Sequence, residues 1–227
     1  IGPDVSWMHK LYDPYYDPFW RTCEELGLVV NAHSGTGSPD YGAFPFSGLL
    51  QALEIPFYSQ RPLVQMMISG VFERFPGLRF VTTELGAAWV PELLKTLDFF
   101  MASIASGQLG EFRYHDGAAP RKSATEYFHT NCWLGVSMAS RADVEARYAV
   151  GVDRWMWGSD YPHDEGSYPH TKDAVRNAFQ DVDPNETKAM LAGNAAELYG
   201  FDLDALAPLA AMHGPAVADI HTPPEAA

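Results

Sequence analysis

The chain has few cysteines, few basic residues and no long apolar run. Its two cysteines, Cys23 and Cys132, do not form a Cys-x-x-Cys pair, so no disulfide framework is indicated. The 15 Lys and Arg residues are outnumbered by 29 Asp and Glu residues, and the net charge is −14. This acidic balance argues against nucleic acid or an anionic membrane surface as a partner. No segment reaches the roughly 18 uninterrupted apolar residues of a membrane span.

Two sequence signals of other protein classes are also missing. Residues 1–4 (Ile-Gly-Pro-Asp) contain no initiating Met and no basic-then-apolar leader, and they are typical of a loop inside a protein. A Gly-x-Ser-x-Gly elbow is absent, which argues against a serine-type hydrolase. With 47% hydrophobic residues the chain can still form a sizeable core. We therefore expect a soluble cytoplasmic protein.

The most informative segment is residues 154–163, Arg-Trp-Met-Trp-Gly-Ser-Asp-Tyr-Pro-His. It predicts an apolar strand that ends at a carboxylate, Asp160, followed by a proline turn and an imidazole, His163. A charged group at the end of a buried strand is costly unless it has a partner or a function. Active sites of α/β proteins lie at the carboxyl ends of their parallel strands. A second such strand, residues 28–33, ends at His33, which predicts a metal or acid–base site built from several strands.

Strands and helices are expected to alternate along the chain. The predicted strands are residues 28–33, 78–83, 126–134 and 153–159. The predicted helices are residues 17–26, 57–74, 89–103, 141–149, 171–180 and 183–199, with candidate specificity loops at 34–56 and 105–122 and a loosely docked tail after Pro208. This alternation predicts a parallel sheet covered by helices. Four strands are half of the eight that a closed (β/α)8 barrel requires.

Four motifs together resemble one family. They are His-Ser-Gly at 33–35, Glu-Leu-Gly-Ala-Ala-Trp-Val-Pro at 84–91, Gly-Ser-Asp-Tyr-Pro-His at 158–163 and Gly-Asn-Ala-Ala-Glu-Leu-Tyr-Gly at 193–200. In this order they resemble the amidohydrolase-2 family, the branch of the amidohydrolase superfamily that includes the aminocarboxymuconate-semialdehyde decarboxylase-like enzymes. The last two motifs are specific, whereas His-Ser-Gly alone is weak.

The resemblance implies an α/β fold, a (β/α)8 TIM barrel of the metal-dependent hydrolase type, of which this chain holds about the last four βα units. Residues 1–207 are expected to belong to that single barrel domain, and residues 208–227 to a C-terminal tail. The resemblance also implies a divalent metal ion, with zinc as the first choice and manganese or magnesium as alternatives. His33 matches the family's ligand on the fifth strand and Asp160 its ligand on the eighth.

Two features depart from the family's pattern. The family holds its metal also with a His-x-His pair on the first strand, and the eight histidines of this chain include no such pair. We therefore expect the first four strands, with half of the metal ligands, to lie upstream of Ile1. The decarboxylases carry a catalytic His on the sixth strand, where this chain has Glu84. A carboxylate cannot act as a cationic electrophile, but it can act as a base or orient a water molecule.

Each candidate residue of this site has a structural alternative. His33 is interpreted as a neutral imidazole ligand, or else as a hydrogen-bonded core histidine. Asp160 is interpreted as a ligand and proton acceptor, or else as the carboxylate of an Asx turn. His163 either supports Asp160 and contacts substrate or lies exposed in a loop. Glu84 is interpreted as a catalytic pocket residue, although a carboxylate here also suits the N-terminus of the helix at 89–103.

Four further residues are predicted to bind substrate. Trp89 and Tyr161 are candidate aromatic walls, although either can be part of a core. His129 and Asn131 lie in the predicted strand 126–134, where alternation would place them on one face pointing into the barrel.

We expect a metal-dependent hydrolase or non-oxidative decarboxylase that acts on a small carboxylated or cyclic substrate. The sequence does not choose between the two reactions. The alternative is a non-catalytic half-barrel or scaffold that needs another segment, a second copy or a partner chain to cover its open strand edge and complete its metal site. A homodimer is one such arrangement.

Overall fold

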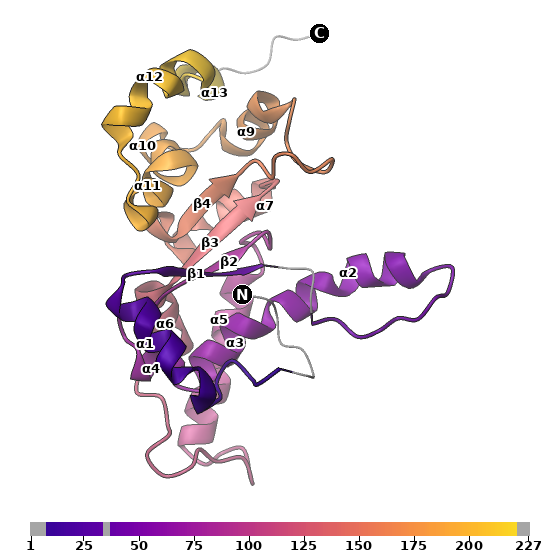
Figure 1. Ribbon diagram of the computed structural model, residues 1–227, viewed down its shortest axis with the longest axis vertical. Helices are drawn as coiled ribbons and strands as arrows, with labels where there is room; N and C mark the ends of the chain where they lie inside the picture. The colour runs from indigo at the N-terminus through magenta and orange to yellow at the C-terminus, as the bar shows by residue number, and fades with distance from the viewer. Residues whose placement is uncertain (1–7, 34–36, 222–227) are drawn as a thin grey trace. The chain divides into compact units, whose positions relative to one another are not determined.

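The computed structural model describes residues 8–33 and 37–221 (Figure 1). The chain divides into two compact units, described here one at a time. The first comprises residues up to Leu85 together with Val90–Trp133, and the second comprises Gly86–Trp89 and the residues from Leu134 onward. None of the helices in the described ranges combines the length and apolar content that a bilayer crossing requires.

The first unit is built around two parallel strands, β1 (Val29–His33) and β2 (Arg79–Thr83). They pair in register from Val29 opposite Arg79 to His33 opposite Thr83. Helix α1 (Asp17–Glu25) follows the short turn η1 (Pro14–Tyr16) and precedes β1. Helices α2 (Ser47–Ser59), α3 (Arg61–Ile68) and α4 (Val71–Arg74) connect the two strands, and α5 (Val90–Ala105) and α6 (Ala124–Asn131) follow them. Parallel pairing through helical crossovers is the connection expected of an α/β fold.

The core of the first unit is apolar and fully enclosed. Its least exposed side chains come from α3, α4, β2 and α6, and they are Leu63, Met66, Met67, Phe72, Phe80 and Phe128. Burying each such side chain stabilises the fold by about 1.5–3 kcal/mol.

The second unit contains the parallel pair β3 (Cys132–Ser137) and β4 (Trp155–Gly158), with Leu134 opposite Trp155 and Ser137 opposite Gly158. The boundary between the units falls inside β3, after Trp133. Helices α7 (Arg141–Glu145) and α8 (Arg147–Val150) and the turn η2 (Val152–Arg154) connect the two strands. After β4 come α9 (Thr171–Phe179), α10 (Pro184–Lys188), the π-helical turn η3 (Ala189–Gly193), α11 (Asn194–Tyr199), α12 (Leu203–His213) and α13 (Val217–His221).

The predicted strand at 126–134 is wrong over most of its length. Residues 124–131 form α6, and only Cys132 onward is extended. Ser123 and Glu126 make a reciprocal capping box that begins a helix, and the buried Ala124, Tyr127, Phe128 and Asn131 recur at helical spacing. His129 and Asn131 therefore do not share the face of a strand.

The predicted helix at 57–74 is also interrupted. It is replaced by α2, α3 and α4, with breaks at Gln60, just before Pro62, and at Gly70, whose φ is 72°. Helix α2 begins at Ser47, so the second half of the expected loop 34–56 is helical. Residues 34–36 of that loop lie outside the described residues.

The expected loosely docked tail is contradicted at its last described turn, residues 217–221, whereas α12 (Leu203–His213) buries no side chain. Helix α12 runs through Pro208, and α13 packs against α9 and α10. Ile220 is only 2% exposed, Arg176 donates from Nε to the Asp219 carbonyl at 3.0 Å, and His221 Nδ1 lies 3.1 Å from the Gln180 carbonyl. An apolar anchor and two polar contacts thus hold the last described turn in place.

Candidate active site

Three consecutive strands are followed by a residue in the left-handed backbone region. Glu84 comes directly after β2 with φ 63°, Met138 directly after β3 with φ 51°, and Asp160 two residues after β4 with φ 58°. This region costs an L-residue roughly 1–2 kcal/mol. Backbone outliers of this kind concentrate at functional sites, where the surrounding structure holds them. The strained carboxylates therefore mark the strand ends as the candidate active site.

In the first unit the strand ends bring His33 to Glu84. His33 Nε2 lies 2.9 Å from Glu84 Oε2, with 51% of the His33 side chain and 19% of the Glu84 side chain exposed. The contact follows from the register, because His33 stands opposite Thr83 and Glu84 is the next residue. The Thr83 hydroxyl is buried and has no hydrogen-bond partner among the described residues. Sequence reasoning selected His33 and Glu84 separately and did not predict that they pair.

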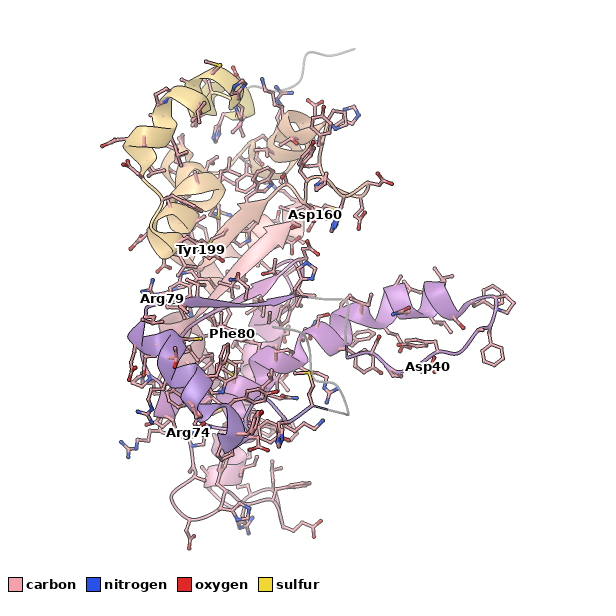
Figure 2. All side chains as sticks on the ribbon, viewed as in Figure 1. Asp40, Arg74, Arg79, Phe80, Asp160 and Tyr199 are labelled. Carbon is pink, nitrogen blue, oxygen red and sulfur yellow. The ribbon has the colours of Figure 1, made fainter. Side chains whose placement is uncertain are left out.

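In the second unit the loop after β4 brings His163 to Asp160. Figure 2 shows Asp160 beyond the end of β4. Its Oδ1 lies 3.0 Å from His163 Nδ1, and only 7% of its side chain is exposed, against 55% for His163. The His163 amide donates to the Asp160 carbonyl at 2.9 Å, and the Tyr161–Pro162 peptide between them is cis. One tight turn therefore positions both the carboxylate and the imidazole.

The loop that carries Asp160 is closed on itself by Ser159, Gly166 and Ser167. Ser167 donates to the Ser159 carbonyl from its amide at 2.9 Å and from its hydroxyl at 3.2 Å. A Cβ on Gly166 would lie 2.8–3.0 Å from the carbonyl oxygens of Asp160, Ser159 and His163. Sequence reasoning stopped at His163 and missed this closure, although Gly-Ser after two acidic residues is a turn signal.

Replacing Gly166 with Ala is expected to loosen this loop. Backbone oxygens cannot move aside as a flexible side chain can, so the added methyl group should cost about 1–3 kcal/mol. For a chain of this length that corresponds to a melting temperature lower by roughly 2–12 °C. Thermal unfolding followed by circular dichroism measures the shift. Gly48→Ala is the matched control, because a Cβ at Gly48 meets nothing within 4 Å, and an equal shift in both variants would contradict the packing argument.

The segment after Glu84 is anchored by Asp143, which sequence reasoning also missed. Asp143 Oδ1 accepts from the amides of Ala87 and Ala88 at 2.6 and 3.0 Å. Its Oδ2 accepts from the amide and the hydroxyl of Ser140 at 2.9 and 2.5 Å. Gly86 has φ 67°, and a Cβ there would lie 2.7 Å from Asp143 Oδ1. The Ser-x-x-Asp spacing of a capping box was the available signal.

These hydrogen bonds determine the charge state of Asp143. Burial alone would raise the pKa of its carboxyl group, but the donors on Ser140, Ala87 and Ala88 outweigh burial and hold the pKa below its usual value. Asp143 is therefore a structural carboxylate that stays ionised at neutral pH.

The four residues predicted to bind substrate lie in different settings. Trp89 is partly buried in the turn before α5. Tyr161 is 67% exposed and packs edge-on against Tyr168 at 5.3 Å between ring centroids. Asn131 is buried on α6 and donates to the carbonyls of Pro76 and Leu78 at 3.0 and 2.9 Å. This amide joins α6 to the turn before β2, and the face-sharing argument that assigned Asn131 and His129 to substrate does not apply.

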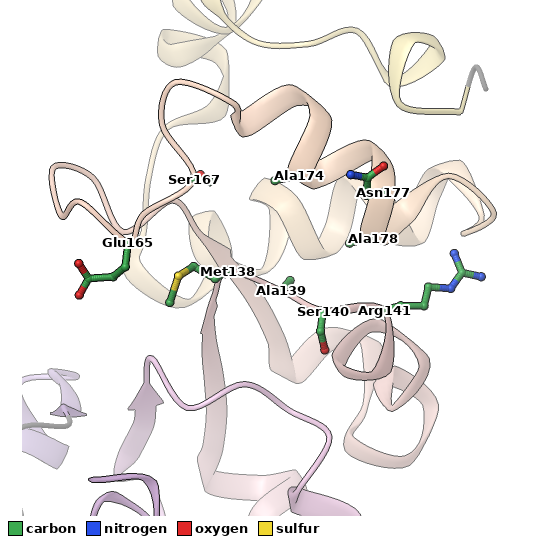
Figure 3. A pocket seen from close by; sticks show the side chains of 9 residues that line it. All are labelled: Met138, Ala139, Ser140, Arg141, Glu165, Ser167, Ala174, Asn177 and Ala178. Carbon is green, nitrogen blue, oxygen red and sulfur yellow. The ribbon is translucent and has the colours of Figure 1, made fainter. Parts of the chain in front are cut away.

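A groove of about 490 Å³ borders the Asp160 loop within the second unit (Figure 3). It runs between the start of α7, helix α9 and the loop after β4. Its lining residues are Met138, Ala139, Ser140, Arg141, Glu165, Ser167, Ala174, Asn177 and Ala178. Arg141 and Glu165 point away from its centre in Figure 3, and Arg141 binds Glu145 and Asp181. Of the remaining lining residues, Met138 and three alanines are apolar, and Ser140, Ser167 and Asn177 are polar.

The donor atoms at these strand ends fit a divalent metal ion. Imidazole nitrogen and carboxylate oxygen are ligands of zinc and manganese. The imidazole of His33, whose Nε2 faces Glu84 at 2.9 Å, and the carboxylate of Asp160 supply such donors. The low exposure of the Asp160 carboxylate also suits a ligand, because a shielded charge needs a cationic or hydrogen-bonding partner.

Solved structures share this arrangement of strands and helices. A 5-carboxyvanillate decarboxylase from Sphingomonas paucimobilis is 21% identical, with a TM-score of 0.71 over 89% of this chain and 58% of its own. An amidohydrolase from Mycobacterium avium subsp. paratuberculosis is 25% identical, with a TM-score of 0.63 over 86% of this chain and 47% of its own. A 5-carboxyvanillate decarboxylase from Novosphingobium aromaticivorans, complexed with manganese and 4-hydroxy-3-methoxy-5-nitrobenzoic acid, is 22% identical, with a TM-score of 0.68 over 88% of this chain and 56% of its own.

This similarity confirms the predicted fold, a part of an amidohydrolase-type TIM barrel containing four βα units. The chain spans between 47% and 58% of the length of these three structures. The model of the amidohydrolase family matches residues 2–201, which include every strand and every motif that carried the resemblance. On the strength of that match, the chain belongs to the amidohydrolase family.

Proposed function

We propose that the protein is a metal-dependent enzyme of the hydrolase or carboxy-lyase type. The observation that carries the proposal is the pairing of a strained carboxylate with an imidazole at two strand ends, Glu84 with His33 and Asp160 with His163. Strand ends of this barrel type are where catalytic residues gather. Residues with a strained backbone cluster at active sites, where the strain is part of the mechanism.

His33 and Asp160 are the proposed ligands of a divalent cation, as the family resemblance implies. Zinc and manganese both suit the donor set, and manganese is the ion in the Novosphingobium decarboxylase structure. When bound, such an ion lowers the pKa of a water molecule and polarises a carbonyl or carboxylate oxygen. Since zinc sites normally use three protein ligands, further ligands would come from elsewhere in the whole protein.

Hydrolysis is the reaction that Glu84 favours. In this reaction a carboxylate of the chain removes a proton from water, and the water oxygen bonds to the carbonyl carbon of the substrate. The bond from that carbon to the leaving group then breaks, and the same carboxylate returns the proton to the leaving group. Asp160 is placed for this task, because its second oxygen is left for a proton when Oδ1 faces His163. Glu84 orients the His33 ring through Nε2, and no cationic imidazole is required at position 84.

Decarboxylation is the second candidate, and the likeness to the two 5-carboxyvanillate decarboxylases favours it. In that reaction the bond between the substrate ring and its carboxylate breaks, carbon dioxide leaves, and a proton replaces it on the ring. Asp160 or Glu84, once protonated, would deliver that proton. The proposed substrate class is a small carboxylated or cyclic molecule in either case. Carbon dioxide release from a panel of hydroxylated benzoates, measured beside the hydrolysis of small lactones and amides, separates the two reactions.

Elemental analysis of the purified protein is the first test. When the further ligands are present, we expect about one zinc or manganese ion per chain, and loss of most of it in His33→Ala. His213→Ala is the matched control, because that histidine is exposed at the end of α12. Metal that survives the loss of His33 and of Asp160 would contradict the proposed ligands.

Elemental analysis also tests the alternative of a non-catalytic half-barrel. It is made on this chain and on any longer product whose coding sequence continues upstream of Ile1. Metal in the longer product alone would mean that these residues are half of a site. Absence of metal from both would overturn the metal-dependent reading and leave a scaffold with the family's fold.

A further inference from the structure

Met138 is the one residue among the three left-handed strand ends that the proposed reaction does not use. It directly follows β3 with φ 51°, and 51% of it is exposed. At other turns of the chain a glycine adopts such a backbone without strain, for example Gly70 with φ 72° and Gly151 with φ 96°. A strained methionine that is half exposed does not contribute to the core. Its side chain therefore points to a contact outside the fold itself.

Met138 stands beside the loop that carries Asp160. Ser137 pairs with Gly158 in register, so Met138 and the Asp160 loop leave neighbouring strands at the same edge of the second unit. Met138 and Ser167, a residue of that loop, both line the groove of about 490 Å³ (Figure 3). A group bound in the groove would therefore lie next to the proposed catalytic carboxylate.

The walls of the groove leave space for a ring. On α9, Ala174, Asn177 and Ala178 recur at helical spacing and present one face to the groove. The two alanines offer only methyl groups, and Met138 adds a flexible thioether of the kind that packs well against rings. Asn177 is exposed, and its carboxamide can donate and accept a hydrogen bond. The volume lies within the range of about 300–1,000 Å³ that is usual for small-molecule pockets.

The charges around the groove are unfavourable for a carboxylate. Arg141 is the only basic residue among the described residues that line the groove. Its guanidinium binds Glu145, with Nε 3.2 Å from Oε1, and also Asp181. Glu165 lies exposed at the rim. Three carboxylates therefore surround one guanidinium, and a bound carboxylate would meet net negative charge.

We propose that this groove binds an uncharged ring, that the Met138 thioether contacts that ring, and that Glu165 at the rim disfavours a carboxylate there. The inference rests on the proposed function in one respect, because the ring is taken to be the part of the substrate that lies away from the reacting bond. The reacting bond then faces Asp160. A carboxylate on the substrate has to lie outside the groove.

Nuclear magnetic resonance of the full chain labelled with methyl-¹³C methionine tests the binding without requiring turnover. The chain has eight methionines, and the signal of Met138 is the one that disappears in Met138→Leu. Phenol, an uncharged ring, should shift the Met138 methyl signal saturably at millimolar concentrations. The signal of Met212, which is 72% exposed on α12, is the control and should stay in place. No shift at Met138, or an equal shift at Met212, would overturn the proposal.

Charge selectivity is tested with benzoate as the second probe. Benzoate should bind about five- to tenfold more weakly than phenol, because its carboxylate meets like charge. Glu165→Lys should move the preference toward benzoate by about tenfold or more, since a negative charge at the rim is replaced by a positive one. Asp204→Lys makes the same charge change at an exposed position of α12 and should leave the preference unchanged. Equal effects of the two substitutions, or equal binding of both probes to the wild type, would contradict the assignment of Glu165.

Met138→Gly separates a binding role from a structural one. Glycine adopts the left-handed backbone freely, so the melting temperature should stay the same or rise by up to about 4 °C. Phenol binding, followed on the signals of phenol itself, should weaken by about 2–10-fold because the thioether contact is lost. A lower melting temperature with unchanged phenol binding would show that Met138 serves the fold instead.

The two proposals fail in different experiments. If phenol binds as described while the protein turns over no substrate, the groove stands and the proposed reaction falls. If the protein turns over its substrate but phenol leaves the Met138 signal in place, the reaction stands and the groove is not where the ring binds. In an active enzyme, Met138→Gly should raise KM about 2–10-fold and leave kcat within about twofold, because the thioether touches the ring and not the reacting bond.

Discussion

Asp160→Asn should lower the turnover of the proposed reaction by about 10²–10⁴-fold, the usual contribution of a positioned proton acceptor. Asparagine has nearly the same shape, and it tolerates the left-handed backbone that Asp160 adopts with φ 58°. The loop should therefore keep its conformation, and the loss should come from the missing charge. Because a neutral amide is a weaker ligand than a carboxylate, the bound metal should fall as well.

Turnover and metal content measured together give this prediction two readouts. Asp164→Asn is the matched control, because Asp164 lies exposed in the same loop, and its turnover should stay within a factor of two or so of the wild type. If Asp160→Asn kept both its metal and its turnover within tenfold, Asp160 would be a turn residue, and the chemistry would have to be assigned elsewhere.

Asp143→Ala should destabilise the protein by about 3–5 kcal/mol. Asp143 is 9% exposed, and its carboxylate accepts four hydrogen bonds. Its removal leaves the buried Ala87 amide without a partner, which costs about 1–3 kcal/mol, and hydrogen bonds to a charged group contribute about 1.5–3 kcal/mol each. Urea unfolding measures the loss. Asp204→Ala, at an exposed position of α12, should change the free energy of unfolding by less than about 0.5 kcal/mol.

The protein should lose stability as the pH falls, because folding lowers the pKa of the Asp143 carboxyl group. Since the pKa of Asp143 is lower in the folded chain than its usual 3.8, the folded state binds this proton less readily than the unfolded state. The stabilisation is therefore complete above about pH 4 and is lost as the pH falls through the folded pKa. Unfolding free energies of wild type and Asp143→Ala should converge toward acid. A difference that stays constant down to pH 2 would contradict this account.

The parts of the fold with strong local signals could be predicted from the sequence. The Asp17-Pro18 pair predicted the start of α1 and Gly27 its end, and the observed helix is Asp17–Glu25. The strands at 28–33 and 78–83 were found within one residue, because short apolar runs between turn residues have few alternatives. The strand ends then located His33, Glu84 and Asp160, whose environments the structure describes.

The missed features depend on contacts between segments that are distant in sequence. Residues 126–131 contain side chains that occur in both helices and strands. The capping box at Ser123 and the burial of one face in the tertiary structure favour the helix. Asp143 is an ordinary helical residue in the sequence, and its role appears only when Ala87 and Ala88 are seen 55 or more residues away. The tail after Pro208 has weak local signals, but packing of Ile220 fixes its end.

The left-handed residues at the strand ends have a consequence for how this protein can change over generations. Glycine would adopt the left-handed backbone conformation of Glu84, Met138 or Asp160 without the conformational cost of roughly 1–2 kcal/mol that these residues incur. Mutational drift toward glycine at 84 and 160 is thus opposed only by the work that the carboxylates perform. In a lineage that no longer needed the reaction, these two positions should be the first to relax, whereas Asp143, which the fold itself requires, should persist.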